Sequence, residues 1–279
     1  MLWAVVLPPL VIMLLLFVVP LAYLLFVSFM EPSQSNLYDV RATLENYTGI
    51  LLDSFYLLII RRTLLASALV MLACLLLGYP VAIVIARMTP RWRLVMLLVM
   101  LFPLMVSNVV RAYGWIAILG RRGVVNGTLD SFGLIERPLS MLYSLDAIVL
   151  GLLTILLPFM IISITNSLVA IDKSYAEAAE SLGAGPFRTF VHVTWPLSSP
   201  GVASGIMLVF FLMLSAYVTI ALLGGPRFKL LVSMVYDSVV AFQWPRAAAL
   251  SFILLVIALI FAALVQAVLK PHKVQGRGR

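Results

Sequence analysis

The sequence predicts an all-α membrane protein that crosses the bilayer six times, and its composition is the first reason. Of its 279 residues, 63% are hydrophobic and only 11% are charged, and the mean hydropathy is +1.14. An ordinary soluble domain is about 45–50% apolar and about 25% charged. A water-soluble fold of this size would lack the polar side chains needed to cover its surface. The composition therefore excludes soluble enzymes, nucleic-acid-binding proteins and secreted disulfide-rich domains.

The distribution of charge is the second reason. The net charge is +8, but the 19 lysines and arginines occur singly or in pairs between long apolar runs. Basic residues are placed in this way at membrane surfaces, whereas binding to nucleic acid calls for a basic tract. The single cysteine, Cys74, lies within an apolar run, so neither an intrachain disulfide nor a cysteine-based zinc site can form.

Long uncharged runs predict the individual spans, because a helix needs about 20 mainly apolar residues to cross the hydrocarbon core. We expect one transmembrane domain over residues 1–279, with Arg111 interrupting the third span and Pro196 and Pro200 shortening the fifth. The short apolar segment Phe55–Ile60 is expected to be an interfacial helix that leads into the second span. The expected spans are, to within a few residues, 5–30, 60–87, 94–119, 147–168, 200–224 and 247–269.

Six spans place both termini on the same side of the membrane, and the basic residues favour the cytoplasmic side. Each side receives nine lysines and arginines, so a plain count does not decide. The segments on the side of the termini carry them more densely, with three within Arg87–Arg93 and four in the last ten residues. Because density near the span ends governs orientation, we expect cytoplasmic termini.

The connection over residues 171–199 has helix signals of its own. Ser174 and Glu177 have the spacing of a capping box, and Asp172 is a second candidate N-cap. Gly183 is placed to end this helix in a left-handed conformation, and Pro186 suits the first turn of a following helix. We therefore expect a short helix, a turn and a second helix outside the bilayer, where another protein could dock. The spacing is explained at least as well by a loop helix whose Glu177 only caps its own N-terminus.

The chemistry that the spans lack is also informative. They contain no carboxylate, lysine or histidine, and no glycine-rich loop of the chain ends in Lys-Ser or Lys-Thr. Ionisable residues inside spans usually mark ion coupling or catalysis, so a proton- or sodium-driven carrier is disfavoured. The missing phosphate-binding loop indicates that the chain does not hydrolyse ATP by itself. We expect a transport subunit that is not an enzyme and that takes its energy from a partner.

Motifs in most of the chain resemble those of a known family. Glu177-Ala178-Ala179, Gly183 and Trp195-Pro196-Leu197 resemble the EAA signature in membrane subunits of binding-protein-dependent ABC importers. The likeness covers nearly all of residues 44–269 and is strongest to the spermidine/putrescine permease branch. The further motifs that carry it are Gly78-Tyr79-Pro80, Asn108 with Arg111-Ala112-Tyr113-Gly114, Leu156-Leu157-Pro158-Phe159-Met160, Gly224-Gly225 and Trp244-Pro245.

This resemblance implies a MetI-like permease fold in the bacterial inner membrane, with two such subunits around a translocation path for a polyamine. The second permease is expected to be a different, homologous chain. The other expected partners are two ATP-binding cassette subunits, which bind ATP and magnesium, and an extracytoplasmic substrate-binding protein; this chain is expected to bind no cofactor, metal or nucleic acid. The loop helix would be a coupling helix in contact with the ATPase in the cytoplasm. The residues expected to couple are Ser174, Glu177, Ala178, Ala179, Glu180 and Gly183.

A path for a polycation without span carboxylates must use aromatic faces, backbone carbonyls and hydroxyls. A desolvated cation–π contact is worth roughly 2 kcal/mol. For the aromatic candidates the alternative is contact with lipid, which we favour for Trp115. Arg111 could hold its helix against the second subunit or set selectivity, or its side chain could extend to the outer surface. The candidates for the path are Asn108, Arg111, Tyr113, Phe210, Phe211 and Tyr217.

The sequence leaves several alternatives open for the substrate, the function and the helix packing. The missing span carboxylates leave room for another small amine, an amino-acid-like compound or a phosphonate as the substrate of the same importer class. A self-sufficient carrier or channel would need no ATPase, and a scaffold would only hold partners at the membrane; the loop helix argues against the carrier. Gly201 and Gly205 form a GxxxG pattern, which either marks close helix packing or arises by chance.

Overall fold

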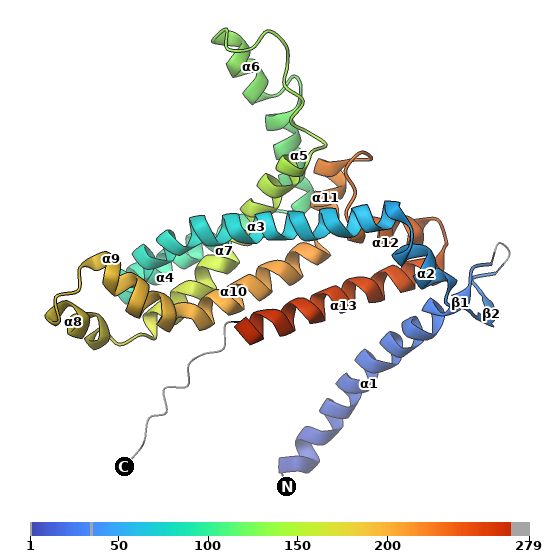
Figure 1. The fold of residues 1–279 in the computed structure, drawn as a ribbon, viewed down its shortest axis with the longest axis horizontal. Helices are drawn as coiled ribbons and strands as arrows, with labels where there is room; N and C mark the ends of the chain where they lie inside the picture. The colour runs from blue at the N-terminus through green and yellow to red at the C-terminus, as the bar shows by residue number, and fades with distance from the viewer. Residues whose placement is uncertain (1, 34–35, 269–279) are drawn as a thin grey trace. The chain divides into compact units, whose positions relative to one another are not determined.

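The computed structural model describes residues 2–33 and 36–268, and most of them are helical (Figure 1). Five helices of this described part are long and apolar enough to cross a membrane, and the count reaches six when the bent pair Pro90–Met105 and Asn108–Ser131 is taken as one span. The prediction of an all-α polytopic membrane protein is confirmed. The basic tail that contributes to the predicted orientation, residues 270–279, lies outside the described residues.

Contacts within the chain divide it into two compact units. Unit 1 comprises Met1–Arg62 and Leu230–Ile257, and unit 2 comprises Thr63–Lys229 and Ala258–Arg279. The boundaries fall inside two long helices, which contribute residues to both units. The prediction of a single transmembrane domain stays a prediction.

Unit 1 has a core of apolar side chains from four helices. The amide of Asn46 ties two of its segments together, because it donates hydrogen bonds to the carbonyl oxygens of Ser28 at 3.0 Å and Met30 at 2.8 Å. The buried core residues are Ile50, Ile59, Leu231, Ala249, Leu250 and Ile253. The elements are α1 (Leu2–Ser28), the antiparallel strands β1 (Met30–Glu31) and β2 (Asp39–Ala42), α2 (Glu45–Leu51), the start of α3 (Ser54–Arg87), α12 (Leu231–Val240) and most of α13 (Trp244–Val268).

The second membrane helix is longer than predicted. Helix α3 runs without a break from Ser54 to Arg87, so Phe55–Ile60 forms its first turns and is not a separate helix. Its start is fixed by Asp53, whose carboxylate accepts a hydrogen bond from the backbone N–H of Phe55 at 2.8 Å. Phe55–Ile60 is helical and leads into the second span as predicted, and its location at the membrane interface stays a prediction.

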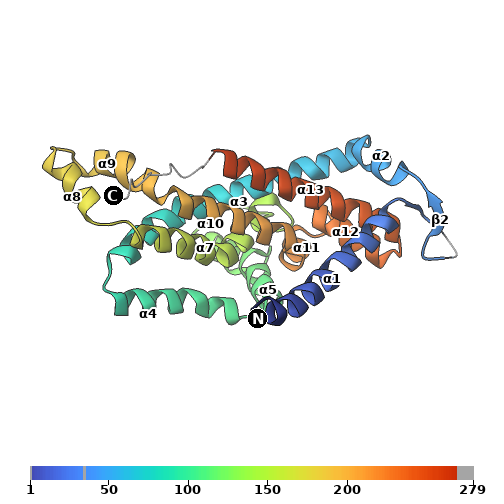
Figure 2. The same cartoon turned by 90° about the horizontal axis from the view of Figure 1, so that it is seen from below.

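Unit 2 contains the remaining helices, and α7 and α10 lie side by side within it (Figures 1 and 2). The elements, besides the rest of α3 and the end of α13, are α4 (Pro90–Leu101), η1 (Phe102–Met105), α5 (Asn108–Leu119), α6 (Val124–Ser131), α7 (Leu145–Val169), α8 (Ser174–Ser181), α9 (Pro186–Thr189), η2 (Phe190–Thr194), α10 (Trp195–Ser215) and α11 (Tyr217–Gly224). Helix α4 has no buried residue, whereas about half of the window of α7 that would span a membrane is buried (50%).

The GxxxG pattern lies in the contact between α7 and α10. A Cβ atom on Gly201 would lie 2.8 Å from the carbonyl oxygen of Ser163, and one on Gly205 would lie 2.7 Å from the sulfur of Met160. Real Cβ atoms essentially never come so close to another heavy atom. Of the two explanations for the pattern, the structure favours close helix packing.

The fifth span begins and ends earlier than predicted. Residues Pro186–Ser215 form one apolar stretch of helix, in which η2 is a π-helical turn between α9 and α10. Pro196 occupies the first turn of α10 and Pro200 its interior, so neither proline ends the helix. The helix stops at Ser215, nine residues before the predicted end at 224, because Ala216 leaves the helical conformation with φ −79° and ψ 52°. Because the helix already begins at Pro186, the non-helical part of the predicted connection over residues 171–199 is shorter than expected.

Candidate functional site

Helix α8 ends as the sequence predicts. Gly183 adopts φ +83°, and its N–H donates to the carbonyl oxygen of Glu180 at 2.9 Å. The N–H of Ala184 donates to the carbonyl oxygen of Ala179 at 3.0 Å, which completes a Schellman motif. Pro186 occupies the first turn of α9, so the predicted order of helix, turn and helix is confirmed.

The beginning of α8 differs from the predicted capping box. Ser174 is the first helical residue and its side chain caps no backbone group, so the box with Glu177 does not form. Asp172, the second candidate, accepts a hydrogen bond from the backbone N–H of Ser174 at 2.8 Å. That bond and a further one from the Ser174 hydroxyl lower the pKa of Asp172 from its ordinary value. An ionised carboxylate is the stronger acceptor, which explains why Asp172 and not Ser174 fills this role.

Helix α8 is exposed along its length. None of its residues is buried, and it packs against α9 and η2 at one end of unit 2 (Figure 1). The side chains of Tyr175, Leu182 and Phe187 are 52%, 89% and 77% exposed. The exposed carboxylates of Glu177 and Glu180 lie on the same short helix. Exposed apolar residues beside charged ones mark a surface for contact with another protein.

The third span is broken, but not at Arg111. Helices α4 with η1 and α5 with α6 meet at an angle of 84°. The break follows Pro103 and the 3₁₀ turn η1, and Ser107 begins the next helix by accepting a hydrogen bond from the N–H of Val109 at 3.3 Å. The interruption predicted at Arg111 is therefore misplaced, because the break lies between Met105 and Asn108 of the third span. Its apolar sequence concealed a new helix start four residues before Arg111.

Arg111 holds this break from within the chain. Its guanidinium donates to the carbonyl oxygen of Pro103 and, at 3.3 Å, to that of Val106. Both carbonyls lie at the end of η1, and that of Pro103 also accepts the backbone N–H of Val106 at 3.2 Å. Neither alternative considered from the sequence, contact with a second subunit or extension to the outer surface, is needed to explain these two bonds. The Nη1 atom is buried and has no hydrogen-bond partner in the described chain.

A second break lies beside the first, and a pocket of about 330 Å³ opens where they meet. The fifth membrane helix stops at Ser215 and α11 starts at Tyr217, while α5 starts at Asn108. Broken helices at membrane depth are tolerated where they line a cavity, and they often form binding sites there. The lining residues are Leu104, Asn108, Ile155, Leu156, Phe159, Leu212, Ser215, Ala216, Tyr217, Val218 and Thr219.

The candidates for the path are not all brought together. Asn108 and Tyr217 line the pocket, whereas Phe210 is buried and stacks on Phe261 with ring centroids 3.8 Å apart. Tyr113 and Phe211 are exposed and do not line it. For every candidate of the path, whether or not it lines the pocket, a part in transport stays a prediction. The hydroxyls of Ser215 and Thr219 and the ring of Phe159 were missed, because only the break at Ala216 turns them toward one cavity.

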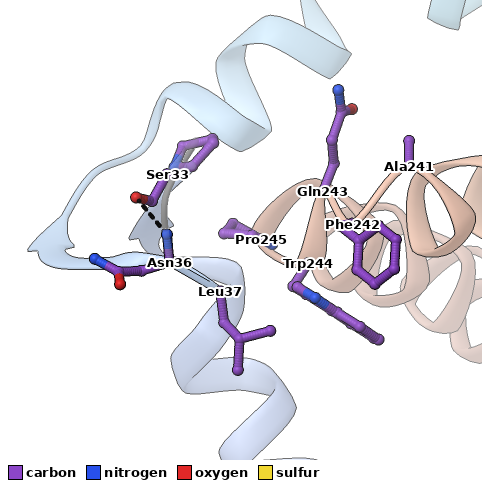
Figure 3. Close-up of a pocket in the computed structure, with 9 residues that line it drawn as sticks. Ser33, Asn36, Leu37, Ala241, Phe242, Gln243, Trp244 and Pro245 are labelled. Carbon is purple, nitrogen blue, oxygen red and sulfur yellow. Dashed lines mark hydrogen bonds between the residues drawn. The ribbon is translucent and has the colours of Figure 1, made fainter.

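Unit 1 contains a larger hollow of about 620 Å³ (Figure 3). Phe242 lines it in a left-handed conformation with φ +57°, and the indole N–H of Trp244 is buried without a hydrogen-bond partner in the described chain. On the facing segment the N–H of Asn36 donates to the hydroxyl of Ser33 at 3.2 Å. This hollow contains the Trp244-Pro245 motif, but none of the candidate site residues.

The long apolar helices, two of them broken beside one pocket, and the exposed helix α8 define a polytopic membrane protein with the features of a transport subunit. A model of the family described as "Binding-protein-dependent transport system inner membrane component" matches residues 75–271. The chain belongs to this family and is a multi-pass protein of the inner membrane.

Individual relatives agree with this assignment. The chain is 32% identical to the spermidine/putrescine transport system permease protein PotB of Haemophilus influenzae over 234 residues, which are 84% of this chain and 82% of that protein. The protein of the same name in Escherichia coli K12 is 31% identical over 231 residues, which are 82% and 84% of the two chains. A crystal structure of a bacterial ABC transporter involved in the import of alginate, an acidic polysaccharide, gives a TM-score of 0.77 at 19% identity, over 98% of this chain and 96% of that chain. The predicted permease fold is confirmed.

Proposed function

We propose that this chain is a permease subunit of an ATP-driven importer, that it forms part of the path for a polyamine such as spermidine or putrescine, and that partner ATPases drive it through α8. The exposure of α8 is the observation that carries the proposal. A helix with a fixed turn at each end and no buried residue has no role in the core of its own chain. The names of the relatives and the family support both the importer class and the substrate.

We propose that α8 faces the cytoplasm. The turn between α3 and α4 lies at the same end of unit 2 as α8 and α9 (Figures 1 and 2). That end carries Arg87, Arg91, Arg93, Lys173 and Arg188. This concentration of basic residues supports a cytoplasmic location, and with six spans both termini lie on that side.

Coupling would use the surface of α8. The carboxylates of Glu177 and Glu180 supply charge, and the small Ala178 allows a partner to approach closely. The Gly183 turn fixes α8 relative to α9, which continues through η2 into α10. Force on α8 would therefore be passed along the chain toward a membrane span. The full assembly would contain a second permease, two ATP-binding cassette subunits that hold ATP and magnesium, and an extracytoplasmic binding protein.

The pocket between the two breaks suits an amine. None of its lining residues carries a formal charge, so a cation would meet the rings of Phe159 and Tyr217 and the amide oxygen of Asn108. Cation–π contacts and neutral acceptors attract a polyamine without trapping it. The guanidinium of Arg111 is directed to the carbonyls of Pro103 and Val106.

Reconstitution tests this function. The chain is co-expressed with candidate partner permease, ATPase and binding-protein subunits, and the complex is placed in vesicles. We expect uptake of labelled spermidine that requires ATP on the side of α8 and the binding protein on the other. Uptake that follows an ion gradient without ATP would instead indicate a secondary carrier. If the complex takes up another solute with ATP, but neither spermidine nor putrescine, the proposed substrate would be wrong.

A further inference from the structure

A cluster of aromatic rings joins α3 to the start of the fifth span, and it involves none of the residues assigned so far. The ring of Tyr79 lies 5.2 Å from that of Trp195 and 5.5 Å from that of Phe190, measured between centroids. The rings of Phe190 and Trp195 are 6.4 Å apart. The motifs Gly78-Tyr79-Pro80 and Trp195-Pro196-Leu197 thus meet in the structure.

A hydrogen bond completes the cluster. The hydroxyl oxygens of Tyr79 and Ser198 lie 2.6 Å apart, and both residues are buried. Ser198 donates its proton to the carbonyl oxygen of Trp195 at 3.1 Å, so the hydroxyl of Tyr79 is the donor to Ser198. The carbonyl oxygen of Ser198 in turn accepts from the hydroxyl of Ser167 on α7 at 3.4 Å. Ser198 therefore connects three membrane helices.

The cluster lies where the helix geometry changes. Phe190 is the first residue of the π-helical turn η2, and Trp195 is the first residue of α10. Single π turns inside α-helices occur mostly at functional positions, and they interrupt the regular hydrogen-bond ladder. Without a support at this point, movement of α8 and α9 would bend the chain at η2 and would not move α10.

The neighbouring glycine fixes α3 on its other side. A Cβ atom on Gly78 would lie 3.3 Å from side-chain carbons of both Met160 and Ile161 on α7. The contact is therefore tighter than most contacts that a Cβ makes, and it holds α3 close to α7 beside Tyr79. Side-chain hydrogen bonds between membrane helices contribute about 0.6 kcal/mol on average.

We infer that Tyr79 is a positioning residue for transport: its hydroxyl and ring tie α3 to the π turn, so that displacement of α8 and α9 moves α3 and α10 together. This inference rests on the proposed function of α8 as the coupling helix. It assigns a role to two motifs that the coupling helix and the pocket do not use. The expected consequence of losing the tie is a cycle in which ATP is hydrolysed but less substrate crosses.

The test uses the complete reconstituted importer and measures spermidine uptake per ATP hydrolysed. Tyr79→Phe and Ser198→Ala should each lower this ratio about three-fold, the equivalent of about 0.6 kcal/mol, with the ATPase rate largely kept. The double variant should be no worse than either single variant, because both remove the same bond. The ratio does not depend on the amount of protein inserted, so a poorly expressed variant still gives an answer.

Matched controls separate this role from a loss of packing. Ser204→Ala removes a hydroxyl that only donates to Gly201 of its own helix, and Tyr56→Phe removes one in unit 1. Both should keep the wild-type ratio. A wild-type ratio in Tyr79→Phe, or a parallel fall of uptake and ATPase rate, would overturn this inference but not the proposed function. Absence of ATP-dependent uptake by the wild-type complex would overturn the proposed function and this inference with it.

Discussion

The guanidinium of Arg111 donates a hydrogen bond to the carbonyl oxygen of Pro103, eight residues earlier and across the break in the third span. The Pro103 carbonyl also accepts the backbone N–H of Val106, and in a bilayer no water is available as a further donor. Arg111 supplies the donor from the same chain. A side chain of the same chain therefore bridges the bend.

Arg111→Met is predicted to impair folding and transport. It would remove this donor from the carbonyls of Pro103 and Val106, and one hydrogen bond contributes about 0.5–1.5 kcal/mol net; the Pro103 carbonyl keeps the N–H of Val106. Thermal unfolding in detergent should show a lower Tm, and uptake should fall. Arg122→Met is the matched control, because Arg122 lies exposed in the turn after α5. A neutral result for Arg111→Met would favour a side chain that extends freely to the membrane surface.

The contact between α7 and α10 should not accept even a methyl group. Gly201→Ala is predicted to lower the thermal stability by about 1–3 kcal/mol, as overpacking of a filled interior does, because the new Cβ would meet the carbonyl oxygen of Ser163. Gly49→Ala is the control, since a Cβ on this helical glycine has nothing within 4 Å. Equal melting temperatures for the two variants would contradict the packing role of the GxxxG pattern.

The number of spans and the end of α8 were predictable, whereas the two breaks were not. Hydropathy detects long apolar runs, and Gly183 is the residue that a left-handed helix end requires. Residues 94–119 read as one span because Pro103 and Ser107 hardly alter the hydropathy. The break depends on a hydrogen bond from Arg111 that closes only in three dimensions. The motifs containing Tyr79 and Trp195 were visible in the sequence, but not their contact.

Glu177→Ala combined with Gly183→Pro is predicted to abolish transport while the protein remains in the membrane. Proline cannot adopt the φ of +83° at position 183, and it lacks the N–H that donates to Glu180. The turn that presents α8 would be lost together with one of its carboxylates. Membrane content is measured by immunoblot and uptake with labelled spermidine. Gly185→Ala, at a φ of −70° with nothing within 4 Å of the new Cβ, is the control. Normal uptake by a well-inserted double variant would rule out coupling through α8.

The start of α8 should be insensitive to pH near neutrality. The pKa of Asp172 is lowered by hydrogen bonds from Ser174, so its contribution to α8 is complete above the ordinary carboxyl range and is lost only as the pH falls through the lowered pKa. Hydrogen exchange of the peptide covering α8, followed by mass spectrometry and corrected at each pH for the intrinsic exchange rate, should be equally slow at neutral and mildly acidic pH. Asp172→Ala should speed exchange, whereas Asp172→Asn keeps an acceptor oxygen and should change it less. Faster exchange already at mildly acidic pH would contradict the lowered pKa.

The pocket between the two breaks gives the last prediction. Asn108→Leu removes one polar group that lines it and should lower the maximum rate of spermidine uptake about five-fold, as expected for the loss of one hydrogen bond of about 1 kcal/mol. The substrate concentration for half-maximal uptake should change little if, as proposed, an external binding protein captures the substrate first. Val109→Leu changes the next residue, which does not line the pocket, and should transport normally. An unchanged maximum rate in Asn108→Leu would show that the substrate passes elsewhere.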